Sequence, residues 1–368
     1  MTAVPMAHWV SRSLLASCLV LAACGGTSGG PLPGAGSSSG AGPSSSGLGS
    51  SGASSSGSSG SGSGASSSGS GGDNSVGPGG DDASPAPGDG GSNHGDASTS
   101  ADGSGGGSGD KCFPAGSGTD FASDGPLMAM TADVPSVSCT IIRPTVLGSG
   151  GCLNPVIVWG NGTTNSPSSY TALFNHFATH GFIVAAADTS NAGSGMEMLA
   201  CLTYILGQNT MSGSPLEGHV DTAHIASSGY SQGGAGCLAA GEDPRFTTVL
   251  AVSPYVVISL GSYDPSTYAK AQTHPLFMIS GSSDTVATPN NNQQPIFDTA
   301  PVPIFWGTHA GSTHFEVLGA GGAYAGPMTA WFRWKLIGDP NARSWFEKPP
   351  CTLCTATGWT VQTNSKWQ

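Results

Sequence analysis

The sequence A-H-I-A-S-S-G-Y-S-Q-G-G, residues 223–234, decides the fold. Its first half is a run typical of a strand inside a sheet, and a helix is predicted directly after it. Between the two, Gly229, Ser231 and Gly233 match G-x-S-x-G, the pattern of a strained turn that lifts a serine out of a sheet. The stretch therefore makes Ser231 a candidate nucleophile.

The pattern alone is weak, because the chain has 59 glycines and repeats it at Gly26–Ser28–Gly30 and Gly36–Ser38–Gly40. Both repeats lie in residues 25–110, which are mostly Gly and Ser with some Ala, Pro and Asp. A segment with so little to bury is expected to be a flexible linker, roughly 50 Å in root-mean-square length. No strand precedes these two serines and no helix follows them, so neither is a candidate.

Residues 1–24 have the features of a secretory signal. Arg12 precedes the apolar run 14–21, which is too short to span a bilayer, and the segment ends in L-A-A-C at Cys24. L-A-A-C resembles a bacterial lipobox, which implies cleavage before Cys24 and acylation of its thiol. We therefore expect a cell-surface or outer-membrane lipoprotein, anchored to the membrane through Cys24. The alternative is ordinary signal cleavage and a freely secreted, extracellular protein.

Residues 111–368 contain the aromatic and aliphatic runs that the linker lacks, and this length suffices for one large domain with a single core. The chain has a net charge of −12, and seven aspartates of the linker account for much of it. Only nine Lys and Arg fall in the domain, which gives it no basic patch. No nucleic-acid partner is expected.

The cysteines of the domain are expected to form disulfides rather than to bind metal, because the chain carries an export signal. Cys351 and Cys354 form a C-x-x-C motif, but no second pair of ligands lies beside it, so no zinc site is expected. The number of these cysteines is odd, so at least one thiol is free or pairs outside the chain. Their pairing stays open; the seven are Cys112, Cys139, Cys152, Cys201, Cys237, Cys351 and Cys354.

Short apolar runs alternate with segments of helical spacing along the domain. Such alternation predicts an α/β fold with a mostly parallel sheet and helices on both faces, in which ligands bind beyond the carboxyl ends of the strands. The predicted strands are 155–159, 182–187, 223–228, 249–252, 275–280 and 302–306. The predicted helices are 168–179, 196–206, 232 to about 241, and about 324–336.

A nucleophilic serine needs a base, which in turn is oriented by a carboxylate. In this type of fold the chain order is Ser, then Asp or Glu, then His. Asp284 lies just past the predicted strand 275–280, and His314 lies in the segment that follows strand 302–306. Both are therefore expected at the same edge of the sheet as Ser231, and the three form the predicted catalytic triad.

Other imidazole and carboxylate side chains fit these roles less well. His309 is the main rival base, but it comes earlier in its segment than His314. His180 closes a predicted helix, where a C-terminal cap is the simpler role. Asp188 follows a strand but precedes the serine in the chain, which breaks the order. The two remaining carboxylates lie in a predicted helix and in a loop before a strand: Asp298 and Asp264.

The tetrahedral intermediate of acyl transfer also needs hydrogen-bond donors for its oxyanion. One is expected to be the backbone N–H of Gln232, directly after the nucleophile. The other is expected from the glycine-rich segment 160–164, which follows the first buried strand.

In combination, these motifs resemble the bacterial cutinases and polyester hydrolases of the α/β-hydrolase fold. The resemblance covers roughly residues 125–350 and implies that Ser231, Asp284 and His314 form the triad, with the N–H groups of Thr163 and Gln232 as the oxyanion hole. The matching pieces are P-V-I-V-W-G-N-G-T-T (155–164), H-G-F-I-V-A-A-A-D-T-S-N (180–191), G-Y-S-Q-G-G (229–234), S-S-D-T-V-A-T-P (282–289), S-T-H-F (312–315) and T-A-W-F-R-W-K-L (329–336).

The resemblance implies a serine carboxylic-ester hydrolase, a monomer without metal or cofactor, acting through an acyl-enzyme on ester substrates, polymeric and lipid esters among them. The expected substrate-binding residue is Tyr255. The family usually has an aromatic residue at Thr163 and a tryptophan near Tyr255, so the resemblance does not extend to a preference for aromatic polyesters. The segment between strands 249–255 and 275–280 is too short for a large lid. The alternatives are a lipase, a polyhydroxyalkanoate depolymerase, or a surface binding protein without catalysis.

Overall fold

The structure is a computed structural model that describes residues 120–134, 136–257, 265–347 and 350–368. The predicted signal at 1–24, with the predicted lipid-attachment site at Cys24, and the predicted linker at 25–110 lie outside the described residues. So do the beginning of the predicted domain at residue 111 and the rival carboxylate Asp264. No helix of the described part is long and apolar enough to cross a bilayer.

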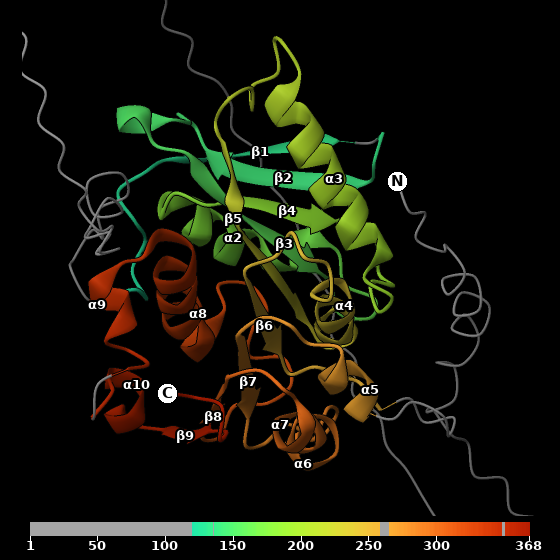
Figure 1. Ribbon diagram of the computed structural model, residues 1–368, viewed down its shortest axis with the longest axis vertical. Coiled ribbons are helices and arrows are strands. Elements are labelled where there is room, and N and C mark those ends of the chain that lie inside the picture. The colour runs from blue at the N-terminus through green and yellow to red at the C-terminus, as the bar shows by residue number, and fades with distance from the viewer. Residues whose placement is uncertain (1–119, 135, 258–264, 348–349) are drawn as a thin grey trace, which may run out of the picture. The chain divides into compact units, whose positions relative to one another are not determined.

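The described strands form one nine-stranded sheet in the order β1-β2-β4-β3-β5-β6-β7-β8-β9 (Figure 1). The strands are β1 (Ala129–Val134), β2 (Cys139–Pro144), β3 (Asn154–Gly160), β4 (Ile183–Ala187), β5 (Val220–Tyr230), β6 (Thr248–Val252), β7 (Leu276–Gly281), β8 (Ile304–His309) and β9 (Trp359–Thr363). The six central strands, from β4 to β8, pair in parallel, and β1, β2 and β9 are antiparallel additions at the two edges. The predicted mostly parallel sheet is confirmed.

Helices cover both faces of this sheet (Figure 1). The α-helices are α2 (Thr171–Thr179), α3 (Met196–Thr210), α4 (Gln232–Ala240), α5 (Pro265–Lys270), α6 (Pro289–Asn292), α7 (Gln294–Thr299), α8 (Ala325–Phe332), α9 (Pro340–Arg343) and α10 (Thr352–Thr355). Short 3₁₀ turns are η1 (Ser149–Gly151), η2 (Pro167–Tyr170) and η3 (Gly322–Tyr324), and η4 (Arg333–Ile337) is a π-helical turn.

Successive residues of β3 alternate between the two faces of the sheet, and both faces are buried. Ile157 and Trp159 belong to the core beneath α2 and α8, whereas Val156 and Val158 belong to the core beneath α3 and α4. Successive residues of a strand point to opposite faces, so an unbroken apolar run is needed when helices cover both sides. This accounts for the apolar runs that identified the central strands in the sequence.

Several element boundaries differ from the prediction. The strand predicted at 223–228 begins at Val220, the helix predicted at 196–206 continues to Thr210, and the closing helix is divided among η3, α8 and η4. The edge strands β1, β2 and β9 were not predicted. Strands β1 and β9 each pair on one side only, where polar residues are tolerated. Strand β2 pairs with both β1 and β4, but Thr140 and Arg143 interrupt its apolar residues, so it also lacks the apolar run that marks the central strands.

Two disulfides join described residues, Cys139 to Cys201 and Cys351 to Cys354. Cys152 is also disulfide-bonded. The C-x-x-C motif is therefore a disulfide and not a metal site, as predicted. Among the described cysteines Cys237 has a free thiol, which is buried on α4, and burial raises its pKa well above the ordinary value.

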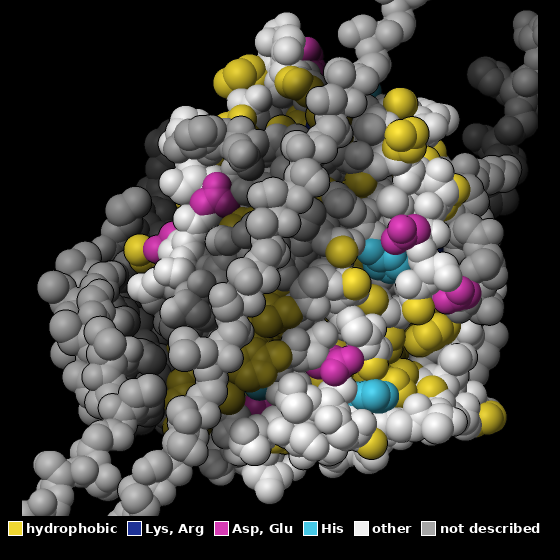
Figure 2. Space-filling view, turned by 180° about the vertical axis from the view of Figure 1, so that it is seen from behind, with side chains coloured by type: hydrophobic (Ala, Val, Ile, Leu, Met, Phe, Trp, Pro, Cys, Tyr) yellow, Lys and Arg dark blue, Asp and Glu magenta, His cyan; other side chains and the backbone are white. Residues whose placement is uncertain are grey.

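The surface agrees with the acidic composition. Figure 2 shows acidic side chains scattered over one face of the molecule, where basic side chains are scarcely visible. The chain has 22 Asp and Glu against 10 Lys and Arg. On the face that is drawn, no basic patch offers a site for a polyanion.

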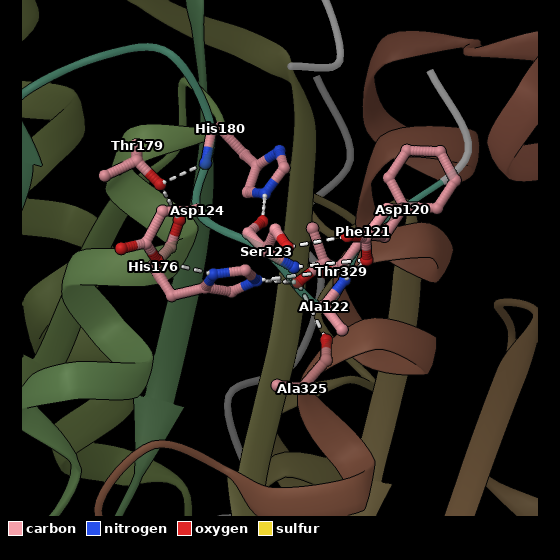
Figure 3. Close-up of polar contacts among 11 residues, drawn as sticks. Asp120, Phe121, Ala122, Ser123, Asp124, His176, Thr179, His180, Ala325 and Thr329 are labelled. Atoms are coloured by element: carbon pink, nitrogen blue, oxygen red, sulfur yellow. Dashed lines mark hydrogen bonds and ion pairs between the residues drawn. The ribbon is translucent and has the colours of Figure 1, made fainter. Parts of the chain in front are cut away.

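His176 of α2 and His180, which caps the end of that helix, hold the segment that leads into β1 (Figure 3). His176 contacts the Asp124 carboxylate through Nδ1 at 2.9 Å, and through Nε2 it contacts the Phe121 carbonyl at 3.1 Å. His180 Nε2–H donates to the Ser123 carbonyl at 3.0 Å, and His180 Nδ1 is buried without a partner among the described residues. These contacts tie the start of the described domain to the core.

We predict that the domain loses stability in mild acid because of His180. Burial and the neighbouring His176 lower the pKa of His180 from 6.5 to about 4. Between pH 6.5 and 4, His180 is protonated in the unfolded chain but not in the folded one. Its contribution to the free energy of unfolding is therefore fully present above pH 6.5 and is lost as the pH falls toward 4. The loss amounts to about 3 kcal/mol.

The measurement is urea unfolding at pH 7, 5.5 and 4 for the wild type and His180→Gln. Glutamine keeps an N–H donor for the Ser123 carbonyl but does not titrate. The variant is expected to lose less stability than the wild type over this range. Identical pH dependence in the two proteins would contradict the role assigned to His180.

Candidate active site

Ser231 lies in a sharp turn between β5 and α4. Its backbone has φ 56° and ψ −118°, a strained conformation for a residue with a Cβ. The flanking glycines allow it, because a Cβ on Gly229 would lie 2.2 Å from the Gly233 carbonyl oxygen and one on Gly233 would lie 2.1 Å from that of Gly160. The turn predicted from G-x-S-x-G is thus present, and it packs directly on the end of β3.

Three of the predicted residues meet at the carboxyl edge of the sheet. Ser231 follows β5, Asp284 follows β7, and His314 lies in the segment after β8. His314 Nε2 is 2.9 Å from Ser231 Oγ, and His314 Nδ1 is 2.8 Å from Asp284 Oδ2. All three residues are more than nine-tenths buried.

The hydrogen bonds of Asp284 fix how protons are arranged. Its Oδ1 accepts from the N–H groups of Val286 at 2.9 Å and Ala287 at 2.8 Å, which leaves Oδ2 for the imidazole. Burial raises the pKa of Asp284, but the hydrogen bond and charge of His314 and the two N–H groups outweigh it, so the pKa lies below its ordinary value. An ionised carboxylate only accepts, so Nδ1 of His314 donates and Nε2 is free to accept the Ser231 proton.

The rival residues are engaged elsewhere. His309 is the last residue of β8, and its Nδ1 lies 2.7 Å from Ser312 Oγ. Asp188 accepts a hydrogen bond from Thr140 Oγ1 at 2.7 Å. Asp298 lies in α7, as predicted, and accepts from the side chain of Gln294 in the same helix; His180 caps α2, as predicted.

The predicted oxyanion donors belong to two adjoining turns. Residues 162–165 form a β-turn closed by a bond from Asn165 N–H to the Gly162 carbonyl at 3.0 Å. Thr164 has φ 66° and Thr163 does not have a positive φ, which makes this a type II turn with Thr163 at its second position. Within the described residues no group accepts a hydrogen bond from the N–H of Thr163 or from that of Gln232. Both are available to a ligand.

Two further residues border the site. Tyr255, the predicted substrate-binding residue, is partly exposed, and its N–H donates to the Ser231 carbonyl at 2.9 Å. Phe315 was missed in the sequence although it directly follows His314. Its side chain is 60 % exposed, and its ring stands edge-on to the imidazole at 5.6 Å. An exposed phenylalanine beside a candidate base is an apolar surface for a ligand, and adjacency in the chain could have identified it.

No group of three or more His, Cys, Asp or Glu in the described part of the chain could hold a metal ion. The side chains at the site instead form a hydrogen-bonded row of hydroxyl, imidazole and carboxylate. Such a row transfers a proton away from a serine as the serine attacks an electrophile.

Replacing Thr163 with proline tests the first oxyanion donor. Proline has no N–H but suits the second position of a type II turn, so the turn is expected to survive. We expect kcat for an ester such as p-nitrophenyl butyrate to fall roughly 10²-fold. Thr163→Ala, which keeps the N–H, is the control and is expected to remain near wild type. Equal activities of the two variants would mean that this N–H does not contact the oxyanion.

The chain is similar to a known protein family and to several characterised hydrolases. The family model described as PET hydrolase-like matches residues 100–344. Cutinase est2 of Thermobifida alba is 26 % identical over 148 residues, which are 39 % of this chain and 46 % of that protein. Bis(hydroxyethyl) terephthalate hydrolase of Streptomyces coelicolor is 27 % identical over 168 residues, 44 % of this chain and 49 % of that protein.

The chain thus spans about half the length of the curated relatives that it matches. The family match itself extends over more than half of the chain and includes β1 to β8 and every residue of the candidate site. With its mostly parallel sheet and its helices on both faces, the chain belongs to the PET hydrolase-like family of α/β-hydrolases.

Proposed function

We propose that this protein is a serine carboxylic-ester hydrolase that works through an acyl-enzyme. The observation that carries the proposal is the position of His314, whose two ring nitrogens lie 2.9 Å from Ser231 Oγ and 2.8 Å from Asp284 Oδ2. The cutinases and the terephthalate-ester hydrolase among the relatives support the same class of reaction.

The proposed reaction begins when Ser231 Oγ attacks the ester carbonyl and its proton moves to His314 Nε2. The carbonyl oxygen becomes an oxyanion, which accepts hydrogen bonds from the N–H groups of Thr163 and Gln232. The intermediate collapses as His314 returns the proton to the leaving alcohol, and the acyl group remains on Ser231. Throughout, Asp284 stays ionised and stabilises the imidazolium.

Water completes the cycle. It attacks the acyl-enzyme while His314 Nε2 takes one of its protons, and a second oxyanion forms in the same place. Return of that proton to Ser231 Oγ breaks the acyl bond and releases the carboxylic acid. The proton that Ser231 loses leaves with the alcohol and is replaced by one from water, so the enzyme is unchanged at the end of the turnover. The side chains and N–H groups named here suffice for both steps, without a metal or cofactor.

The apolar surface at the mouth of the site supports a hydrophobic acyl group. Phe315 is 60 % exposed, and Val286, whose N–H donates to Asp284, is 48 % exposed. We propose aliphatic polyesters and lipid esters as substrates. Aromatic polyesters are less favoured, because Thr163 and Tyr255 stand where the family usually has larger aromatic residues.

The location of the enzyme remains part of the proposal. We propose export through residues 1–24, a lipid anchor on Cys24 and a Gly/Ser-rich tether at 25–110 that carries a monomeric catalytic domain. A reach of roughly 50 Å would let a surface-bound enzyme work on particles. Release into the medium is the alternative if the lipobox is not used.

A fluorophosphonate probe tests whether Ser231 is a nucleophile. We expect the probe to label the wild type but not Ser231→Ala, and Asp284→Asn to be labelled much more slowly because its imidazole loses the oriented tautomer. Hydrolysis of p-nitrophenyl butyrate is expected to fall by about 10⁴-fold or more in Ser231→Ala. Absence of labelling in the wild type would favour the non-catalytic binding protein instead.

A series of ester substrates tests whether the exposed Phe315 side chain contacts the acyl chain. The wild type and Phe315→Ser are compared on nitrophenyl esters from two to twelve acyl carbons, on triglyceride emulsions and on aliphatic polyester films. We expect the substitution to raise KM for long chains and to leave the shortest ester nearly unchanged, because only long chains reach the exposed ring. An equal effect on all chain lengths would contradict the proposed contact, and a wild type inactive on emulsions and films would exclude polymeric and lipid esters.

A further inference from the structure

We propose that Tyr170 is a positioning residue for the oxyanion hole, a role that rests on the proposed ester hydrolysis. Tyr170 ends η2, eight residues after Gly162, and its hydroxyl oxygen accepts a hydrogen bond from the Gly162 N–H at 3.1 Å. Both residues are buried. The phenol therefore holds the first residue of the turn that presents the Thr163 N–H.

The turn transmits this constraint to Thr163. The N–H of Gly162 is fixed by Tyr170, and the carbonyl of Gly162 is fixed by the Asn165 N–H at 3.0 Å. That carbonyl and the Thr163 N–H belong to one planar peptide group. With both polar groups of Gly162 held, the direction of the Thr163 N–H is set before any ligand arrives, and such preorganisation is what makes an oxyanion donor effective.

The phenol itself has little freedom. The Tyr170 ring is fully buried and lies 5.2 Å from the indole of Trp159 and 5.5 Å from the ring of Phe174. Burial raises the pKa of Tyr170 above its ordinary value, so the hydroxyl is neutral over the working pH range. At the other end of η2 the Ser166 and Ser169 side chains form a capping box, which fixes the start of this turn.

A second tyrosine links the turn to the candidate base. The Tyr230 ring lies 6.2 Å from the ring of Tyr170 and 5.0 Å from the imidazole of His314. It also fills the space beside Gly162, where an added Cβ would lie 2.7 Å from the Tyr230 ring. Tyr230 therefore blocks movement of the turn toward His314, while the Tyr170 hydroxyl prevents it from turning away.

Replacing Tyr170 with phenylalanine tests the hydroxyl and keeps the ring. We expect kcat for p-nitrophenyl butyrate to fall roughly five- to tenfold, the effect of losing one buried hydrogen bond, with KM changed by less than twofold. The inhibition constant of a boronic acid, which forms a tetrahedral adduct on the serine, is expected to rise by the same factor. Tyr204→Phe on α3 is the control, because this partly buried tyrosine packs against the core of the opposite face, and it is expected to leave these values unchanged.

A double variant separates positioning from a general structural role. If Tyr170 acts through the Thr163 N–H, adding Tyr170→Phe to Thr163→Pro costs no further activity, because the donor is already gone. Multiplied effects in the double variant, or a Tyr170→Phe protein with wild-type kcat, would overturn the proposal. If Tyr170→Phe does not fold, 3-fluorotyrosine at position 170 is used instead, because it keeps the ring shape and the hydroxyl but weakens the hydroxyl oxygen as an acceptor. A kcat equal to that of the wild type would then overturn the positioning role of Tyr170.

Failure of the proposed function has a different signature. If the wild type neither hydrolyses p-nitrophenyl butyrate nor reacts with a fluorophosphonate, the proposed esterase is wrong before Tyr170 is considered. If the wild type is active and depends on Ser231, only the measurements on Tyr170 and Thr163 decide the positioning role.

Discussion

The close approach of two backbones at Gly160 and Gly233 is the constraint on which the rest of the site depends. A Cβ on Gly233 would lie 2.1 Å from the Gly160 carbonyl oxygen, so α4 can begin against the end of β3 only if this residue is glycine. That contact compresses the turn between β5 and α4 and holds Ser231 at φ 56°. It also brings the N–H of Gln232, at the start of α4, beside the loop that carries Thr163.

The parallel sheet then assembles the other groups at the same edge. Strands β5, β6, β7 and β8 are neighbours and all end on the same side, so the residues that follow them meet there although they lie far apart in the chain. Asp284 and His314 reach the site in this way. The N–H groups of Val286 and Ala287 fix the orientation of the Asp284 carboxylate, because both donate to its Oδ1. The groups at this edge of the sheet serve both half-reactions of the proposed acyl transfer, because the His314 imidazole moves the proton in acylation and again in deacylation.

The sequence allowed the central strands, the turn at Ser231 and the order of Asp284 and His314 to be predicted. His314 was preferred to His309 only because it comes later in the same segment, since either spacing is compatible with a loop. In the structure, His309 remains in β8 and contacts Ser312, whereas His314 lies farther along and reaches Ser231. Strands β1 and β9 escaped prediction because a strand paired on one side only does not require an apolar run, and β2 escaped it because Thr140 and Arg143 interrupt its apolar residues.

By itself the sequence determined that a strand, a glycine-bounded turn and a helix surround Ser231, since these depend on neighbouring residues and on local sterics. Only the tertiary structure decided which distant groups contact that serine and its surroundings. The bond between His314 and Ser231 spans 83 positions in the chain, and that between His314 and Asp284 spans 30. Even the contact of Tyr170 with Gly162 depends on the packing of η2 against the sheet, because a hydrogen bond needs a direction as well as a spacing, and side-chain direction is set by the core around it.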